Sequence, residues 1–227
     1  MSGANGAAGG GGGAEAQRAG AGRDEVGAGG PRLVLASGSA ARRAMLQNAG
    51  LTFDVVPASI DETAVRQALQ ADDIVPCDIA EVLAIAKAEQ VSARQPGAMV
   101  IGGDQILEHN GVVFEKPATM EVARDHLLSL RGHVHELHSS VALVQDGQTL
   151  WSHTDSAALT MRDVSPAFIG RYLSRVGDAA LTSVGAYQIE GLGVQLFERI
   201  AGQHFTIMGM PLLPLLAELR QRGMIER

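Results

Sequence analysis

The order of short apolar runs and helical stretches constrains the fold more than any other feature of this sequence. Apolar runs typical of buried strands occur at residues 32–36, 53–56 and 99–107, and stretches of helical composition separate them. Two segments of alternating pattern then follow each other directly, at 136–144 and 149–159. Strands separated by helices favour parallel pairing, whereas consecutive strands pair locally. The sequence therefore predicts an α/β fold with a mixed twisted sheet and flanking helices.

The remaining elements complete this prediction. A cleft between two lobes of such a fold is a natural ligand site. Gly50 is expected to end the first helix, and Thr119 to cap a later one. We expect helices at residues 40–49, 61–69, 77–93, 119–130, 166–175 and 211–222, a hairpin return at 112–114, and late strands at 194–198 and 206–208.

Residues 1–30 have a different composition. They hold 12 of the 28 glycines and show no apolar periodicity. Such a segment cannot bury enough surface to offset the entropy of ordering, so it is expected to be a disordered Gly/Ala-rich tail. The run Gly9–Gly13 is not a phosphate loop, because no strand precedes it and no Lys-Ser/Thr pair follows. One folded domain is expected over residues 31–227.

Charge and cysteine content narrow the class of protein. The formal net charge is −7, which argues against a protein that binds a nucleic-acid backbone. No run approaches the ~18 apolar residues of a membrane span, so no membrane partner is expected. Cys77 is the only cysteine and cannot form an internal disulfide. A reducing compartment is the simplest interpretation, and we expect a cytoplasmic protein.

The first candidate site is the turn that follows the first strand. Ser37, Gly38 and Ser39 precede a helix, and Arg42 and Arg43 lie in its first turn. Free N–H groups at a helix N-terminus favour an anion, and an arginine can contact phosphate with two donors. The alternative is a serine-capped helix with ordinary surface arginines.

Two acidic positions are candidate metal ligands. Asp61 and Glu62 are adjacent carboxylates that could hold Mg²⁺ together with substrate phosphates, or could simply begin a helix. Asp104 follows a buried strand and two glycines, Gly102 and Gly103, which would let a ligand approach the backbone. Asp104 could hold a metal or accept a proton from water, and the alternative is an aspartate that caps a turn.

The basic and histidine residues are less specific. Lys87 lies in an apolar helical stretch and needs a partner or a route to solvent, and Lys116 lies between Glu115 and Pro117. His133, His135 and His138 suggest a zinc site. On a strand, however, the first two share one face and His138 points to the other. No cysteine joins them, so we favour roles without metal.

These pieces, in this order, resemble the Maf family of nucleotide pyrophosphatases over about residues 32–222. The resemblance implies a two-lobed fold like that of the inosine-triphosphate pyrophosphatases, with a central cleft. The segments that carry the resemblance are 33–42 for the opening motif, Asp61-Glu62, 84–88 around Lys87, 102–105 around Asp104, Glu115-Lys116-Pro117, 130–135 and 185–191.

The resemblance also implies roles and a substrate. Asp104 would be the proton acceptor, Lys87 and Lys116 would assist it, and Glu62 with Asp104 would bind Mg²⁺, with Mn²⁺ or Co²⁺ as alternatives. Ser37, Ser39, Arg42, Gln105 and Glu190 would bind the substrate. A nucleoside triphosphate would be cut to a monophosphate and pyrophosphate, and the protein would be a homodimer.

Two departures bear on the base. The positions after Ser39 are Ala40 and Ala41, where the family motif has Pro and Arg, so only Arg42 is kept. Gln105 and Glu190 are more similar to the family branch that acts on 7-methyl-GTP. A carboxylate at Glu190 accepts from both guanine donors and favours the positive charge of a 7-methylated base. The alternatives are an inosine-triphosphate-type enzyme and a non-catalytic nucleotide sensor that regulates cell division.

Overall fold

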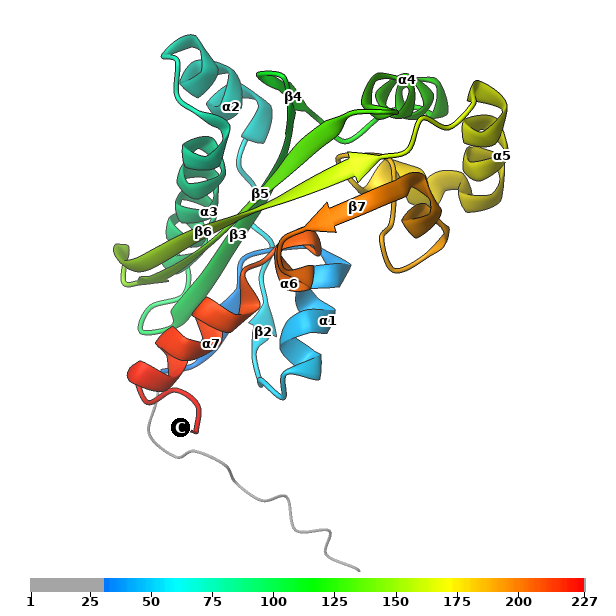
Figure 1. The fold of residues 1–227 in the computed structure, drawn as a ribbon. Coiled ribbons are helices and arrows are strands. Elements are labelled where there is room, and N and C mark those ends of the chain that lie inside the picture. The colour runs from blue at the N-terminus through cyan, green and yellow to red at the C-terminus, as the bar shows by residue number, and fades with distance from the viewer. Residues whose placement is uncertain (1–30, 227) are drawn as a thin grey trace, which may run out of the picture.

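A computed structural model describes residues 31–226 of the chain, and the expected disordered tail at 1–30 lies outside these residues. The sheet has the strand order β2-β1-β3-β5-β6-β7, and β4 pairs with β3 beside this path. Figure 1 shows the long strands β3, β5 and β6 crossing the middle of the molecule. In the part of the chain that the structure describes, no helix is both long and apolar enough to cross a membrane.

The sheet is parallel at one side and antiparallel at the other, as the sequence predicts. β1 (Leu33–Leu35) pairs in parallel with β2 (Asp54–Val55) and with β3 (Met99–His109). The antiparallel part joins β3 to β4 (Val112–Phe114) and β5 (Val134–Gln145), then continues through β6 (Gln148–Met161) to β7 (Phe197–Ala201). The mixed α/β fold is therefore confirmed.

Helix starts follow the local sequence. Thr119 caps the helix that follows it by accepting from the N–H of Val122, and Pro76 and Pro166 stand where a missing N–H costs nothing. Gly50 follows α1 with a positive φ, as its predicted role requires. The helices are α1 (Ala40–Asn48), α2 (Glu62–Ala71), α3 (Pro76–Ser92), α4 (Met120–Leu130), α5 (Pro166–Val176), α6 (His204–Ile207) and α7 (Leu212–Gln221), with short 3₁₀ helices at Gly177–Thr182 and Leu192–Leu196.

Two late strand predictions were wrong. Residues 206–208, expected as a strand, belong largely to helix α6, and residues 194–198 fall across a 3₁₀ helix and the start of β7. Short apolar runs do not distinguish a strand from a helix, because length and tertiary contacts decide between them. Here the carbonyl oxygens of Thr206 and Ile207 accept hydrogen bonds from Gln105, a contact across about a hundred residues of chain.

The two faces of the sheet are covered differently. Helix α3 packs along one face against β3 and β5. The other face carries two separate apolar cores. One lies under α1 and α7 and includes Ile101 and Leu143, and the other lies under α4 and α5 and includes Leu107 and Leu137. Figure 1 shows these two groups of helices at opposite ends of the long strands, which gives the molecule its two lobes.

A polar stretch of sheet separates the two cores. On the face shared with Ile101 and Leu107, strand β3 has Gly103 and Gln105 in between, and β5 has Ser139. The ladder of β3 with β1 ends at Ile101, and that with β4 begins at Leu107. The intervening edge of β3 is paired only with β5, so one side of it is open. The gap between the cores and this open edge together form the floor of a cleft.

Candidate functional site

The cleft between the lobes has a volume of about 1380 Å³. It is bounded by the β1–α1 turn, the start of α2, the open edge of β3, the segment after β4, the loop 181–191 and the residues after α6. Every site residue expected from the sequence lines it: Ser37, Ser39, Arg42, Glu62, Lys87, Asp104, Gln105, Lys116 and Glu190.

The turn at the start of α1 presents donors to this cleft. Ser39 caps the helix by accepting from the N–H of Arg42 at 3.3 Å. The buried Ser37 hydroxyl oxygen accepts from the N–H of Ser39 at 3.3 Å and from Nη1 of Arg42 at 3.1 Å. The capping role left open as an alternative is therefore real, and it holds the first helical turn against the cleft. The N–H groups of Ala40 and Ala41, which begin the helix, have no partner within it.

Arg42, rather than the exposed Arg43, faces the site. Its Nε donates to the carbonyl oxygen of Gly209 at 2.7 Å, a residue 167 positions further along the chain. Burial lowers the pKa of Arg42, while the nearby carboxylates of Asp104 and Glu62 raise it. The guanidinium is thus held in place from two sides and keeps its charge beside two acids. Gly209, which the sequence analysis missed, has φ +100°, a conformation that favours glycine.

Lys87 connects the two candidate metal ligands. Its ammonium lies 2.7 Å from Oδ1 of Asp104 and 2.9 Å from Oε2 of Glu62. Lys87 and Asp104 are both buried, whereas Glu62 is half-exposed toward the cleft. Asp61 begins a helix, as the simpler alternative proposed: its side chain caps α2 by accepting from the N–H of Ala64. Lys87 therefore has the charged partners that an ammonium group in apolar surroundings was expected to need.

Opposing influences act on the ionisation of Asp104. Burial raises its pKa and Glu62 raises it further, while the positive charges of Lys87 and Arg42 lower it. The net direction is upward from the usual aspartate value. A carboxylate with a raised pKa is a better proton acceptor than an ordinary exposed carboxylate. Only Oδ1 of Asp104 contacts Lys87, so Oδ2 is left for other contacts.

Gly102 and Gly103 make room for protein rather than for a ligand. A Cβ on Gly102 would lie 2.1 Å from the carbonyl oxygen of Ala84 in helix α3. A Cβ on Gly103 would lie 3.2 Å from Nε of Arg42. The sequence analysis expected these glycines to let a ligand approach the backbone. In the structure, the groups that approach closely are helix α3 and the side chain of Arg42. The two glycines bring α3 and Arg42 close to β3, and so place Lys87 and Arg42 on either side of Asp104.

Gln105 is held by the protein through its amide nitrogen. Its Nε2 donates to Oγ of Ser139 at 3.0 Å and to the carbonyl oxygens of Thr206 and Ile207 at 3.1 and 3.0 Å. These bonds join β3 to helix α6 across the polar gap between the cores. Its Oε1 remains as the group that faces Gly209 and the cleft.

Glu190 and Lys116 lie apart from this cluster. Glu190 is exposed, and its carboxylate lies 3.0 Å from Nε2 of His204. Lys116 is exposed beside Glu115. Within residues 31–226, neither makes a hydrogen bond or ion pair with Asp104, Lys87 or Arg42. The cleft therefore has a buried centre, made by Arg42, Lys87 and Asp104, and an exposed rim to which these two residues contribute.

The sequence analysis missed one basic residue of the site. Arg66 lines the cleft from α2, where it forms an ion pair with Glu115, and only 14% of its side chain is exposed. Glu62 and Arg66 are four residues apart on one helix, so they lie on the same face. The four-residue spacing from Glu62, which was already a candidate, could have identified Arg66 from the sequence.

A buried histidine lies in the core beside the cleft. Nε2 of His135 lies 2.8 Å from the hydroxyl of Tyr187, while its Nδ1 is buried without a partner in the described chain. Burial, with a smaller effect from His109, lowers the pKa of His135 to about 4. His138 lies on the opposite face of β5, and His133 is exposed just before the strand. The three histidines therefore do not converge.

The pKa of His135 predicts an acid-sensitive fold. The folded protein binds fewer protons than the unfolded chain between the usual histidine pKa of 6.5 and about 4, so stability falls as the pH drops through this window. The full shift corresponds to about 3 kcal/mol. We expect urea unfolding of His135→Gln to depend less on pH in this window than urea unfolding of the wild type. Parallel curves for His135→Gln and wild type would contradict this account.

Comparison with known proteins bears on this cleft. The family model for Maf-like proteins matches residues 32–222. A 7-methyl-GTP pyrophosphatase of Mesorhizobium japonicum is 57% identical over 195 residues, which is 86% of this chain and 98% of that protein. A nucleoside triphosphate pyrophosphatase of Paramagnetospirillum magneticum is 51% identical over 190 residues, 84% of this chain and 98% of that protein.

Solved structures are less similar. A dITP/XTP pyrophosphatase of Mycobacterium abscessus aligns over 85% of this chain and 95% of its own, with a TM-score of 0.40 and 13% identity. This likeness carries no weight for or against the inosine-triphosphate alternative. The family match covers the whole cleft and both lobes, and the relatives match almost end to end, so this chain belongs to the family of Maf-like proteins.

Proposed function

We propose that this protein is a nucleoside-triphosphate pyrophosphatase, which cuts between the α- and β-phosphates and releases a nucleoside monophosphate and pyrophosphate. The observation that carries the proposal is the buried centre of the cleft, where Lys87 bridges Asp104 and Glu62 beside Arg42. Relatives with the printed names of such enzymes, at more than 50% identity, support the same activity.

Several of the chain's own residues would bind the triphosphate. The first turn of α1 offers N–H groups and a favourable dipole to an anion, and Arg42 adds a fixed guanidinium. Lys116 on the rim and Arg66 on α2, which is paired with Glu115, add positive charge, which would favour a substrate with about four negative charges. The phosphate chain would then lie along the open edge of β3, with its α-phosphorus next to Asp104.

Asp104 would orient a water molecule and accept its proton as the water attacks the α-phosphorus. Its raised pKa suits this task, because a general base works best when its pKa approaches the working pH. Lys87 holds Asp104 in place through Oδ1 and keeps it ionised in a buried setting. With Arg42, it would also offset the charge that develops on the phosphoryl oxygens.

The acidic pair fits a magnesium ion. Glu62 and Asp104 each contact Lys87 through one oxygen, which leaves the second oxygen of each for a cation. Mg²⁺ is bound in proteins by one or two carboxylates together with substrate phosphates, so this donor set matches it, and Mn²⁺ or Co²⁺ would also fit. When bound, the metal would neutralise phosphate charge and polarise the bond to the leaving pyrophosphate.

The base would be read at the rim by Glu190. Its carboxylate, oriented by His204, could accept from the two donors on a guanine edge, and its charge would favour a 7-methylated base. Uracil and thymine present acceptors there, which a carboxylate repels. The first relative's name, 7-methyl-GTP pyrophosphatase, supports this preference. The preferred substrate would therefore be 7-methyl-GTP, with removal of modified nucleotides in the cytoplasm as the biological role.

The proposal is tested by pyrophosphate release, with Mg²⁺, from a panel of the common NTPs, dTTP, UTP, ITP and 7-methyl-GTP. We expect 7-methyl-GTP to have the highest kcat/KM. Preferential release from ITP would favour the inosine-triphosphate type, and release from dTTP or UTP would keep the activity but overturn the role of Glu190. Nucleotide binding without any release would support the sensor alternative and contradict the proposal.

Glu190→Gln tests base recognition separately. A neutral amide cannot accept from both guanine donors and loses the attraction to a positive base, so kcat/KM for 7-methyl-GTP should fall by about 10-fold or more. The ratio of UTP to 7-methyl-GTP turnover should rise. His204→Gln is the matched control, since it removes only the residue that orients Glu190 and should give a smaller change. An unchanged substrate ratio in Glu190→Gln would show that the base is read elsewhere.

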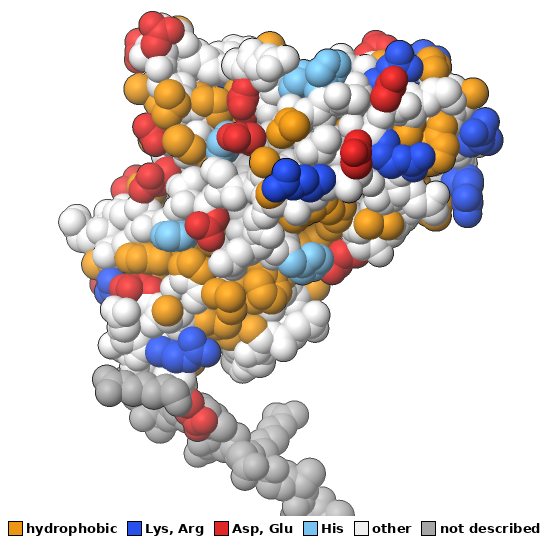
Figure 2. Space-filling model, in the orientation of Figure 1, with side chains coloured by type: hydrophobic (Ala, Val, Ile, Leu, Met, Phe, Trp, Pro, Cys, Tyr) orange, Lys and Arg blue, Asp and Glu red, His pale blue; other side chains and the backbone are white. Residues whose placement is uncertain are grey.

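A homodimer, which the family resemblance implied, remains a proposal. Figure 2 shows an apolar area over the lower lobe, and the exposed large apolar side chains include Leu150, Ile200 and Leu213. An exposed apolar area of this kind is a common feature of subunit interfaces.

A further inference from the structure

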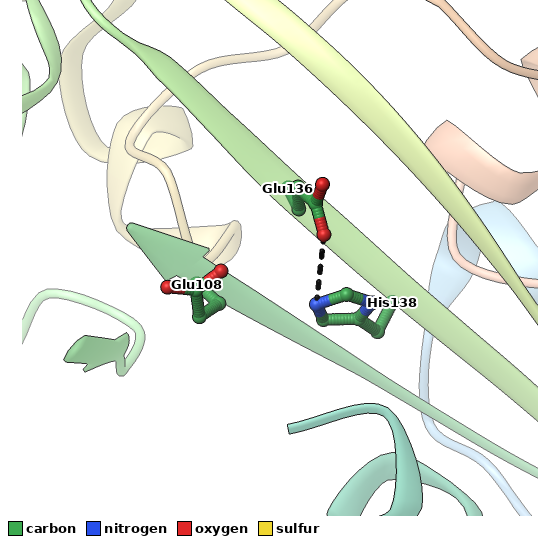
Figure 3. Close-up of side chains that lie close together, drawn as sticks. All are labelled: Glu108, Glu136 and His138. Carbon is green, nitrogen blue, oxygen red and sulfur yellow. Dashed lines mark ion pairs between the residues drawn. The ribbon is translucent and has the colours of Figure 1, made fainter. Parts of the chain in front are cut away.

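A second group of metal-ligating side chains lies outside the cleft, on the face of the sheet that α3 covers. Glu108 comes from β3, and Glu136 and His138 come from β5. Glu108 and Glu136 are direct cross-strand partners, and His138 is two residues further along β5, so all three project from the same face. Figure 3 shows the carboxylate of Glu136 facing the ring of His138, with Glu108 beside them on the neighbouring strand.

The geometry brings one ligand atom of each residue together. The imidazole nitrogen and the two carboxylate oxygens all lie within 4.8 Å of one another. Ligands about 2.0–2.2 Å from a tetrahedral ion are roughly 3.4 Å apart. Small rotations of the glutamates would therefore close the site, and both have room, because Glu136 is exposed and Glu108 is half-buried.

The charges of the group are unbalanced without a cation. Like charges directly opposite each other on paired strands are destabilising. Glu108 accepts from the N–H of Gly111, and Glu136 lies 3.6 Å from Nε2 of His138. Over residues 31–226, neither glutamate forms an ion pair with a lysine or arginine. A divalent ion between them would compensate both charges.

His138 supplies an independent indication of a ligand. It is only 7% exposed, and its Nδ1 lies 2.7 Å from Oγ of Ser156 on β6. When Nδ1 donates to Ser156, Nε2 carries a lone pair directed at the glutamates. At 3.6 Å from Glu136 this nitrogen is too far for a hydrogen bond. Metal-binding histidines are usually oriented in this way, through a hydrogen bond from the other ring nitrogen.

We propose that Glu108, Glu136 and His138 form a binding site for a divalent transition metal of the Zn²⁺ type, separate from the catalytic cation. An imidazole with two carboxylates suits Zn²⁺ or Co²⁺ better than Mg²⁺, which prefers oxygen ligands alone. The ion would join β3 to β5 four residues beyond Asp104 on β3. One coordination position would remain for water or a further ligand.

The experiment is a titration of the chelator-treated full chain with Zn²⁺ followed by calorimetry, and with Co²⁺ followed by visible absorption, without nucleotide and with excess Mg²⁺ present. The excess Mg²⁺ is present to compete for the carboxylates of the cleft, where the proposed catalytic cation would bind. We expect one equivalent of Zn²⁺ to bind, and Co²⁺ to give the absorption bands of a site with a nitrogen ligand. The metal should raise the melting temperature of the wild type.

Variants assign the ion to the site. His138→Gln should abolish the high-affinity equivalent, Glu136→Gln should weaken it, and Ser156→Ala should weaken it by about 10-fold through the histidine's orientation. The matched control is His153→Gln. His153 also faces a carboxylate two residues away on a strand, with Nε2 at 3.1 Å from Asp155, but that pair has no third ligand among the described residues.

Three outcomes would overturn the proposal: a wild type that binds no Zn²⁺, undiminished binding in His138→Gln and Glu136→Gln, or an equal loss in His153→Gln. If His138→Gln fails to fold, Glu136→Gln decides, because that side chain is exposed and its loss leaves the core intact. Pyrophosphate release with Mg²⁺ should stay near the wild-type value in Glu136→Gln, which separates this site from the proposed catalytic one.

Discussion

Asp104→Asn should lower kcat for pyrophosphate release by about 10²–10⁴-fold, the usual cost of losing a positioned general base. The amide keeps the size of the side chain. Its oxygen can still accept the hydrogen bond from Lys87, whose Nζ lies 2.7 Å from Oδ1 of Asp104 in the wild type. It cannot accept the proton of the attacking water. In the proposed mechanism nucleotide binding would rest mainly on Arg42 and the first turn of α1, so KM should change much less than kcat.

The comparison with Glu62→Gln makes this result specific. Glu62 is half-exposed, pairs with Lys87 and would bind the metal without taking part in proton transfer, so part of its loss should be recovered at higher Mg²⁺ concentration. Asp104→Asn should not be rescued by Mg²⁺, since its defect includes proton transfer. Near wild-type kcat at saturating Mg²⁺ would remove Asp104 from the role of base. Melting curves of both variants establish that the fold is retained.

The sequence identifies the residues that the structure brings together in the buried centre of the cleft, because each of them is tied to a local signal. Asp104 follows an apolar strand, Arg42 lies in the first turn of the helix that Ser39 caps, and Lys87 interrupts an apolar helical stretch. Each signal left an alternative open. The structure shows that two descriptions can hold together, since Ser39 is an ordinary N-cap and also holds the turn that faces the cleft.

What the sequence does not predict depends on contacts between distant residues. Arg42 is fixed by Gly209, and Gln105 by Thr206 and Ile207, across more than a hundred residues in each case. No local pattern records such contacts. The same contacts explain the wrong strand at 206–208, because a β-branched and apolar run became a single helical turn that covers the polar gap in the sheet. The role of Gly102 was misjudged for the same reason.

In the proposed function, the residues that would carry the chemistry lie on rigid elements, and the residue that would read the base lies on the rim. Arg42, Lys87 and Asp104 are each held by at least one other protein group, and all three come from α1, α3 or β3. Glu190 is exposed in the loop 181–191, so replacing its side chain should disturb little packing. Chemistry on a rigid centre and selectivity on an exposed rim would let related proteins change base preference without losing hydrolysis.

Gly102→Ala should be among the most destabilising single substitutions in this protein. The new Cβ would lie 2.1 Å from the carbonyl oxygen of Ala84 and 2.8 Å from Cβ of Ala88. The first of these is helix backbone, which cannot rotate away, so α3 must move off the sheet. Overpacking a core costs about 1–3 kcal/mol, and a backbone contact belongs at the upper end of that range or above it. Urea unfolding and melting temperature measure the loss.

Two glycine controls distinguish this cause from a general effect of adding a methyl group. Gly170→Ala on α5 meets nothing within 4 Å and should leave stability unchanged or raise it slightly. Gly103→Ala meets the side chain of Arg42 at 3.2 Å and, at the ordinary contact distance of 3.5 Å, the carbonyl oxygen of Ser140, so it should displace Arg42 and lower activity more than stability. Gly102→Ala should lower both, because α3 carries Lys87, and a displacement of about 1 Å in a positioned group can cost 10²-fold in rate. Wild-type melting of Gly102→Ala would mean that α3 does not pack this closely on β3, and the ion pair between Lys87 and Asp104 would then need another explanation.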